Sequence, residues 1–167
     1  MIITNTKIIT WGKPNQILEG KALRIADGKI ATIGDASEIQ RRYPGEEVLD
    51  AGGQYVMPGN ICAHTHFYGA FSRGMSIPGP APANFVEILQ SLWWKLDKAL
   101  DAESIKYSAL ACLVDAIKYG TTTLFDHHAS PNYIDGSLDI TDEAVEAAGV
   151  HTSLNKEVTD RDGNERA

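Results

Sequence analysis

The sequence is poor in cysteine, in basic charge and in long apolar runs, and each shortage excludes a class of protein. Two cysteines in 167 residues, Cys62 and Cys112, are too few for a disulfide framework. No apolar run reaches the roughly 18 residues of a membrane-spanning helix, and the N-terminus lacks the pattern of a secretory signal. A formal charge of -7 disfavours nucleic acid and anionic membranes as partners. We therefore expect a cytoplasmic protein that binds a small neutral or cationic ligand.

Residues 1–55 predict a small strand-rich module. The composition is that of a globular protein, with 43% hydrophobic and 22% charged residues. Three apolar stretches, at 2–10, 18–26 and 29–34, are typical of short strands, and Asp27-Gly28 between the last two is a strong hairpin signal. Residues 36–42 predict a short helix.

From residue 56 onward, the pattern of the chain changes to alternating strands and helices. Apolar residues at steps of three and four predict a helix over 84–100. Asp101 as N-cap and Gly120 as stop signal bound a second helix, and a third is expected from Thr141 to Gly149. Strands are expected at 121–125 and 151–158. This alternation predicts the α/β class, with a parallel sheet or barrel.

His64 and His66 lie two residues apart, just after a short apolar run that predicts a buried strand. Residues i and i+2 of a strand share a face, so both imidazoles can reach one divalent ion. A bare pair of solvated histidines is the commoner reading of such spacing, and only the context favours a metal site. Cys62 is also an even number of residues away and would share this face of a regular strand. It is a weaker candidate for a third ligand, because a small buried thiol is more usual at that position.

A second polar cluster, Asp126-His127-His128, follows the next predicted strand of the parallel sheet. Active sites of α/β barrels are built at the carboxyl ends of the strands, where both clusters are expected to lie. Because side chains alternate along a strand, only one of the two histidines can face the site. We favour His128 as a substrate-binding residue, with a structural histidine as the equal alternative.

Several short elements together resemble the amidohydrolase superfamily. In the order seen there, the chain has Asp-Gly-Lys-Ile at 27–30, Ile-Gly at 33–34, Asp-Ala-Gly-Gly at 50–53, Val-Met-Pro-Gly at 56–59 and His-Thr-His at 64–66. Ser-Arg-Gly at 72–74, the Trp-x-x-acid element at 94–97 and residues 118–126 resemble the chlorohydrolase and aminohydrolase branch. The stretches Trp-Trp-x-Leu-Asp and Asp-His-His-Ala-Ser-Pro are most similar to aminohydrolases of the SsnA type.

This resemblance implies a composite β-sandwich, of which residues 1–55 would form the N-terminal half, and a (β/α)8 TIM-like barrel. It implies one divalent metal, Zn or Fe, with His64 and His66 as two of its ligands. The family's other ligands follow the fifth, sixth and eighth strands. Since such a barrel needs about 250 residues, residues 56–167 have room for only three units. We therefore expect an incomplete N-terminal portion, with the general base beyond Ala167 and no turnover by the isolated chain.

The activity implied by the resemblance is that of a hydrolase of carbon–nitrogen bonds. Attack of a metal-activated water on a nitrogen heterocycle would release ammonia, as in a deaminase. The alternatives are a chlorohydrolase or cyclic amidase of the same fold, and an inactive fragment that binds a partner chain. We expect the chain to act as a homo-oligomer or with a complementing chain that completes the barrel.

Further residues are candidates for contact with the substrate. Arg73 suits a carboxylate or carbonyl group of a ligand, although a solvated loop arginine is an equal alternative. Trp94 is expected to cover a planar ligand, whereas Trp93 is more typical of a core position. Of Lys156 and Glu157, strand alternation allows only one to reach the site.

Overall fold

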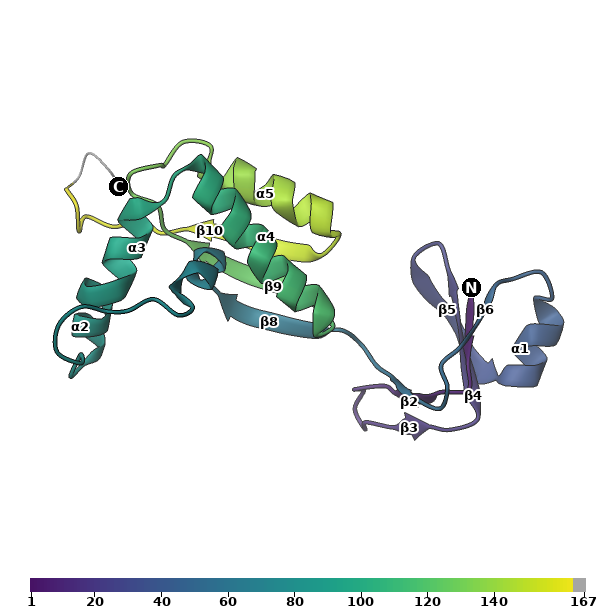
Figure 1. Ribbon diagram of the computed structural model, residues 1–167. Coiled ribbons are helices and arrows are strands. Elements are labelled where there is room, and N and C mark those ends of the chain that lie inside the picture. Colours follow the sequence, from purple (N-terminus) through teal and green to yellow (C-terminus); the bar gives the residue numbers. More distant parts are fainter. Residues whose placement is uncertain (164–167) are drawn as a thin grey trace. The chain divides into compact units, whose positions relative to one another are not determined.

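The computed structural model describes residues 1–163 and divides into two compact units, Met1–Pro58 and Gly59–Ala167 (Figure 1). The division falls after Pro58, whereas the sequence suggested a boundary after residue 55. The polar residues 160–167 predict a loop after the last strand, and of these, residues 164–167 lie outside the described part of the chain.

The first unit contains two small sheets. One has the strand order β5-β4-β1-β6, with bounds β1 Ile2–Thr4, β4 Lys21–Ala26, β5 Lys29–Asp35 and β6 Val48–Asp50. The other has the order β3-β2-β7, with bounds β2 Lys7–Ile9, β3 Ile17–Leu18 and β7 Tyr55–Val56. Asp27 and Gly28 have φ values of 51° and 69°, as a tight two-residue turn between antiparallel strands requires, and the hairpin expected there is confirmed.

Helix α1, Ala36–Arg42, packs on the four-stranded sheet of this unit. The side chain of Asp35 accepts hydrogen bonds from the backbone amides of Ser37 and Glu38, which caps the helix. Ile39 is buried against Ile2 of the sheet. The short helix expected over 36–42 is thereby confirmed.

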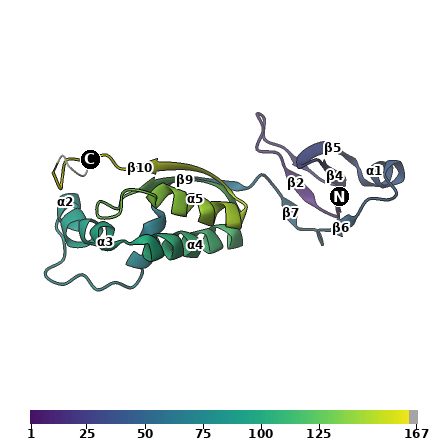
Figure 2. The same ribbon diagram turned by 90° about the horizontal axis from the view of Figure 1, so that it is seen from above.

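The second unit is built on three parallel strands in the order β10-β9-β8. Their bounds are β8 Asn60–Thr65, β9 Thr121–His128 and β10 His151–Lys156. Helices α4, Ala102–Lys118, and α5, Ser137–Ala148, cover one face of this sheet (Figures 1 and 2). Between β8 and α4 lie a 3-10 helix, η1 (Phe67–Ser72), and the helical elements α2 (Phe85–Ile88), η2 (Leu89–Trp93) and α3 (Trp94–Ala99).

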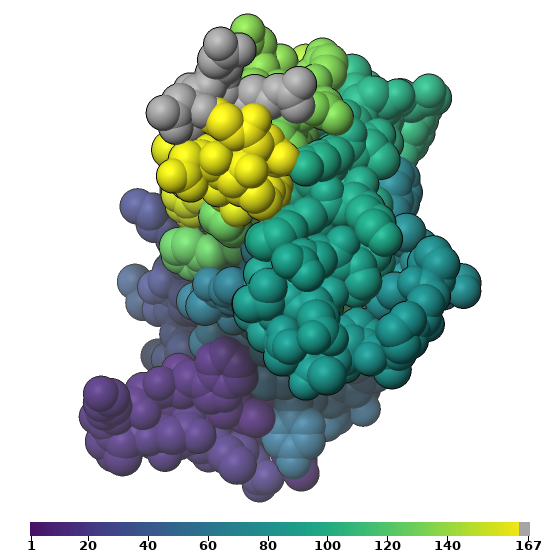
Figure 3. Space-filling view, turned by 90° about the vertical axis from the view of Figure 1, so that its left-hand side faces the viewer, coloured from purple at the N-terminus to yellow at the C-terminus, as the bar shows by residue number. Residues whose placement is uncertain are grey.

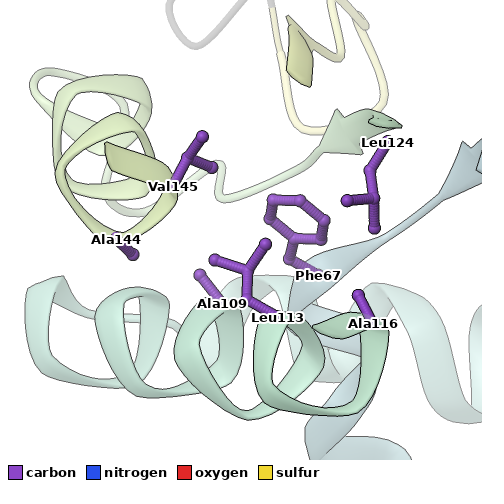
Figure 4. Close-up of a cluster of buried hydrophobic side chains, with 7 residues drawn as sticks. All are labelled: Phe67, Ala109, Leu113, Ala116, Leu124, Ala144 and Val145. Carbon is purple, nitrogen blue, oxygen red and sulfur yellow. The ribbon is translucent and has the colours of Figure 1, made fainter. Parts of the chain in front are cut away.

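A buried cluster holds the helices on the sheet (Figure 4). Leu124 of β9, Leu113 of α4, Val145 of α5 and Phe67 of η1 are each at most 5% exposed. Burying such side chains contributes about 1.5–3 kcal/mol each. The cluster therefore fixes the residues that follow β8 and the middle of β9 in one rigid arrangement.

Two helices differ from their predicted forms. The helix expected over 84–100 is interrupted by the π-helical segment Leu89–Trp93, which apolar spacing alone does not reveal. The helix expected to begin at Thr141 begins at Ser137. The Thr141 hydroxyl donates to the carbonyl oxygen of Ser137 at 2.9 Å, so this threonine lies inside the helix and does not cap it.

A mixed α/β architecture is confirmed, and the assignments to a β-sandwich half and to a (β/α)8 barrel stay predictions. No helix within residues 1–163 is long and apolar enough to cross a membrane.

Candidate metal centre and adjoining cavity

His64 and His66 direct their imidazoles to the same side of the sheet at the carboxyl end of β8. Their Nε2 atoms are 3.0 Å apart. Two nitrogens at that separation can each lie about 2.0–2.1 Å from one ion. The structure thus brings together the two residues predicted to ligate a metal.

The second imidazole is oriented by the neighbouring strand. Nδ1 of His66 lies 2.7 Å from the main-chain oxygen of His127. Because a carbonyl oxygen only accepts hydrogen bonds, Nδ1 carries the proton and Nε2 presents its lone pair. Burial lowers the pKa of His66, and this favours the neutral imidazole that a metal requires.

Strand β8 contains a bulge directly before the histidine pair. Cys62 pairs with Leu124 and Thr65 with Asp126, so three steps on β8 match two on β9. One extra residue in a strand reverses the parity of everything beyond it. Cys62 therefore packs against the helix-side core, its thiol donating to the carbonyl oxygen of His64 at 3.3 Å. The suggestion that Cys62 is a third ligand is wrong for this reason.

On β9 the side chains alternate as expected, but it is His127, and not the predicted His128, that lies on the same side as His66. Leu124, Asp126 and His128 are each at most 2% exposed and face the helices. His127 is exposed on the other face, where its ring centroid lies 5.4 Å from that of His66. The structure therefore places His127, and not the predicted His128, on the cavity beside His66.

His128 has partners of its own in the buried layer. The hydroxyl of Ser130 donates to the carbonyl oxygen of Tyr133 at 2.6 Å, so Nε2 of His128 donates to that hydroxyl, at 2.9 Å. Burial lowers the pKa of His128 to about 4. A neutral histidine with a satisfied hydrogen bond has a structural role here, which is the alternative that the sequence left open.

Asp126 supports the backbone next to the histidine pair. Its Oδ1 accepts a hydrogen bond from the backbone amide of Phe67 at 2.7 Å, directly after His66. Within residues 1–163, its Oδ2 has no hydrogen-bond partner. Burial raises the pKa of Asp126 to about 7, because the charged form loses its hydration.

A cavity of about 460 Å³ adjoins the histidine pair. His64, His66 and His127 lie on it, and much of the remaining lining is aromatic or charged: Tyr68, Phe85, Trp93, Trp94, Asp97, Glu157 and Arg161. Aromatic walls of this kind suit a planar ligand.

Both tryptophans line this cavity although they are consecutive in sequence. The π-helical segment ends at Trp93, and α3 begins at Trp94. Trp93 also packs against the core cluster around Tyr68, and a side chain at Gly69 would approach its ring to 3.2 Å. The prediction for Trp94 agrees with its place on the cavity, while Trp93 combines the core position expected for it with exposure to the same space.

Charged groups from two segments that are distant in sequence meet on the cavity lining. A guanidinium nitrogen of Arg161 lies 2.9 Å from Asp97 Oδ2 and 3.7 Å from Glu157 Oε2. The guanidinium also lies over the Trp94 ring, 5.0 Å from its centroid. Figure 3 shows this C-terminal segment in yellow against the teal helices. Burial raises the pKa of Asp97, and Arg161 opposes that effect.

The remaining sequence candidates lie elsewhere. Lys156 donates to the carbonyl oxygen of Ile134 and the hydroxyl of Ser137, so Glu157 is the member of that pair on the cavity. Arg73 forms an ion pair with Asp115 of α4 and does not line the cavity. The structure therefore does not bring Arg73 to the other candidate site residues.

Sequence reasoning missed Tyr68 and Arg161 as cavity residues. Tyr68 follows the histidine pair by two positions, and that spacing was the available signal. Arg161 gave no signal, because its contact with Asp97 spans 64 positions of the chain.

The residues present fit part of a metal shell. The convergent Nε2 atoms and the carbonyl-oriented His66 are the donor set that zinc or iron accepts. Within the described residues 1–163, no group of three or more His, Cys, Asp or Glu side chains could hold an ion. The pair has the geometry for two ligands of one ion, and the rest of such a shell would have to come from other groups.

Comparison with known proteins agrees with this geometry. Residues 55–167 match the amidohydrolase family. The 5'-deoxyadenosine deaminase of Methanosarcina acetivorans is 34% identical over 155 residues, which are 92% of this chain and 32% of the relative. The 5-methylthioadenosine/S-adenosylhomocysteine deaminase of Lawsonia intracellularis is 33% identical over 119 residues, 71% of this chain and 26% of the relative.

A solved structure shows the same fold. The atrazine chlorohydrolase TrzN from Arthrobacter aurescens TC1, complexed with zinc, superposes with a TM-score of 0.75 at 22% identity, covering 93% of this chain and 35% of that one. The chain spans between a quarter and a third of the length of these curated relatives. The match over residues 55–167 covers well over half of its length, and the chain belongs to the amidohydrolase family.

Proposed function

We propose that this chain supplies the first two metal ligands and one wall of the substrate cavity of a hydrolytic deaminase. The substrate class is an aminated nitrogen heterocycle of the purine type, in keeping with the deaminase names of the relatives. The observation that carries the proposal is the convergence of two Nε2 atoms, 3.0 Å apart, at the edge of an aromatic cavity.

When bound, a divalent ion, Zn or Fe, would lower the pKa of a water molecule and polarise the carbon under attack. His64 and His66 would hold it, with the His127 carbonyl keeping the proton of His66 on Nδ1. Trp93, Trp94 and Tyr68 would stack against the planar ring and exclude water from it.

We further propose that the remaining ligands and the general base come from polypeptide outside these 167 residues. The incomplete metal shell of residues 1–163 supports this, as does the fact that the chain covers only between a quarter and a third of these relatives' length. Two imidazoles bind a metal weakly and provide no carboxylate to move the proton of the attacking water. The isolated chain is therefore expected to bind metal weakly and to release no ammonia.

Metal titration of the isolated chain tests the ligand assignment. Calorimetry with Zn²⁺ should show weak binding to one site, which is abolished in His64→Ala and in His66→Ala. His151→Ala is the matched control, because His151 is exposed at the start of β10 and outside the cavity lining. Unchanged Zn²⁺ binding in the two cavity variants would refute the assignment.

A chimera tests the reaction itself. This chain would replace the matching third of the Methanosarcina acetivorans deaminase, and ammonia release would be measured on 5'-deoxyadenosine, a chlorinated triazine and a cyclic amide. Deaminase activity that disappears with His64→Ala is expected. Release of chloride without ammonia would instead indicate a chlorohydrolase. Ring opening without ammonia would indicate a cyclic amidase.

A further inference from the structure

The charged end of the cavity has more acceptor capacity than its own cation satisfies. Asp97 is 1% exposed and lines the cavity. Its Oδ2 is bound by Arg161 at 2.9 Å, but within residues 1–163 its Oδ1 has no hydrogen-bond partner. A buried acceptor without a donor is unfavourable, so a donor from a ligand would be favoured here.

Glu157 adds a second unsatisfied carboxylate to the same end. In the described residues its only ion-pair contact is the 3.7 Å approach of Arg161, which is too long for a hydrogen bond. Its buried Oε2 has no hydrogen-bond partner there. Asp162, which also contacts Arg161, is neutralised by Lys98, so Asp97, Glu157 and Arg161 leave an excess negative charge of one.

Arg161 is not free to bind an anionic ligand. Its nitrogens already contact Asp97 and Asp162, and its guanidinium lies over the Trp94 ring. Its side chain is only 13% exposed. An anionic group entering the cavity would meet the carboxylates without a competing cation.

The geometry points to a substrate with a cationic or N–H donor group directed at the part of the cavity that Asp97 and Glu157 line, and we propose that Glu157 binds this group. The aromatic walls reinforce this selection, since a cation is attracted to the faces of tryptophan and tyrosine rings. A charge-assisted hydrogen bond to Glu157 then distinguishes a cationic ligand from a neutral one of the same shape. This inference rests on the proposed function, because it takes the cavity to be the substrate site.

Three planar probes of one shape test the inference: benzamidine, benzamide and benzoate, which are cationic, neutral and anionic. Binding to the 167-residue chain is followed by quenching of tryptophan fluorescence. A Trp11→Phe background leaves only Trp93 and Trp94, both on the cavity. Benzamidine is expected to bind about tenfold more tightly than benzamide, as one charge-assisted hydrogen bond of about 1.4 kcal/mol implies, and benzoate more weakly than either.

Substitution of the carboxylate assigns the effect to Glu157. Glu157→Gln should weaken benzamidine about tenfold and change benzamide less than twofold, and Glu157→Asp should lie between. Glu143→Gln is the control, because it removes the same charge from an exposed position on α5. Equal affinity of the three probes, or equal losses of benzamidine and benzamide in Glu157→Gln, would overturn the inference.

The titration is carried out in EDTA, so it does not depend on the metal. If benzamidine is still bound more tightly than benzamide but Zn²⁺ does not bind His64 and His66, only the proposed function is refuted. Zn²⁺ binding without charge selection would refute only the inference about Glu157.

Discussion

Replacing Asp126 with asparagine should remove one contribution, of roughly 4 kcal/mol, to the pH dependence of folding stability between pH 4 and 7. Burial raises the pKa of this carboxyl from 3.8 to about 7. Since one pKa unit corresponds to about 1.4 kcal/mol, the displacement is worth roughly 4 kcal/mol. Asparagine keeps an oxygen that can accept the hydrogen bond from the Phe67 amide, but it cannot ionise.

The sign of this pH dependence follows from whether the folded or the unfolded chain binds the proton more tightly. Below about pH 4, Asp126 is protonated in both the folded and the unfolded chain and has no pH-dependent effect. Between pH 4 and 7 the unfolded chain loses the proton while the folded chain keeps it, so the free energy of unfolding falls as pH rises. Above pH 7 both states are ionised, and the folded state carries the full cost of the buried charge.

Urea unfolding at pH 4, 5, 6, 7 and 8 measures this effect, with Trp93 and Trp94 as probes in a Trp11→Phe background. The buried amide of Asp126→Asn has its own cost of about 1–3 kcal/mol, which does not vary with pH. The informative quantity is therefore how the difference in unfolding free energy between the two proteins changes with pH. From pH 4 to pH 8 this difference should shift by close to 4 kcal/mol in favour of the asparagine variant.

A parallel pH dependence of the two proteins would refute the reasoning. Asp142→Asn is the matched control, because Asp142 is exposed on α5. That variant should follow the parent protein at every pH.

Three other substitutions test the packing around the site, each by urea unfolding. Leu113→Ala should cost about 2–5 kcal/mol, because Leu113 is 1% exposed in the core under the sheet; a loss below 1 kcal/mol would contradict that placement. Gly59→Ala should cost about 1–3 kcal/mol, since a Cβ there would lie 2.2 Å from Thr122 Cγ2, and Thr122→Ala in the same chain should recover much of it. Asp101→Ala should cost about 1 kcal/mol by removing the capping box with Ser104, and an unchanged stability would show that the cap is dispensable.

Local signals in the sequence were sufficient for much of the fold. Asp27-Gly28 predicted its hairpin because a turn with two positive φ values needs such residues. Asp101 predicted the start of α4 because its side chain satisfies a free backbone amide at 2.8 Å. Short-range geometry decides such features, and a sequence displays it directly.

The features that escaped prediction depend on the register between strands or on contacts between distant segments. The pairing of Cys62 with Leu124 and of Thr65 with Asp126 reveals the extra residue of β8, and no property of β8 alone does so. The sequence also could not show that His128 is buried, because the packing of α4 and α5 determines which face of β9 is covered. The charged end of the cavity depends on Arg161 meeting Asp97, which no local pattern encodes.

The bulge in β8 accommodates one extra residue without shifting the strand on either side of it. Cys62 pairs with Leu124 and Thr65 with Asp126, so deleting Ala63 would restore regular alternation between these pairs and leave His66 beside the same part of β9. What the extra residue changes is the face on which His64 and His66 lie when positions are counted from Cys62. The place of the histidine pair along the sheet is therefore set by its register with β9, and not by the number of residues that precede it in β8.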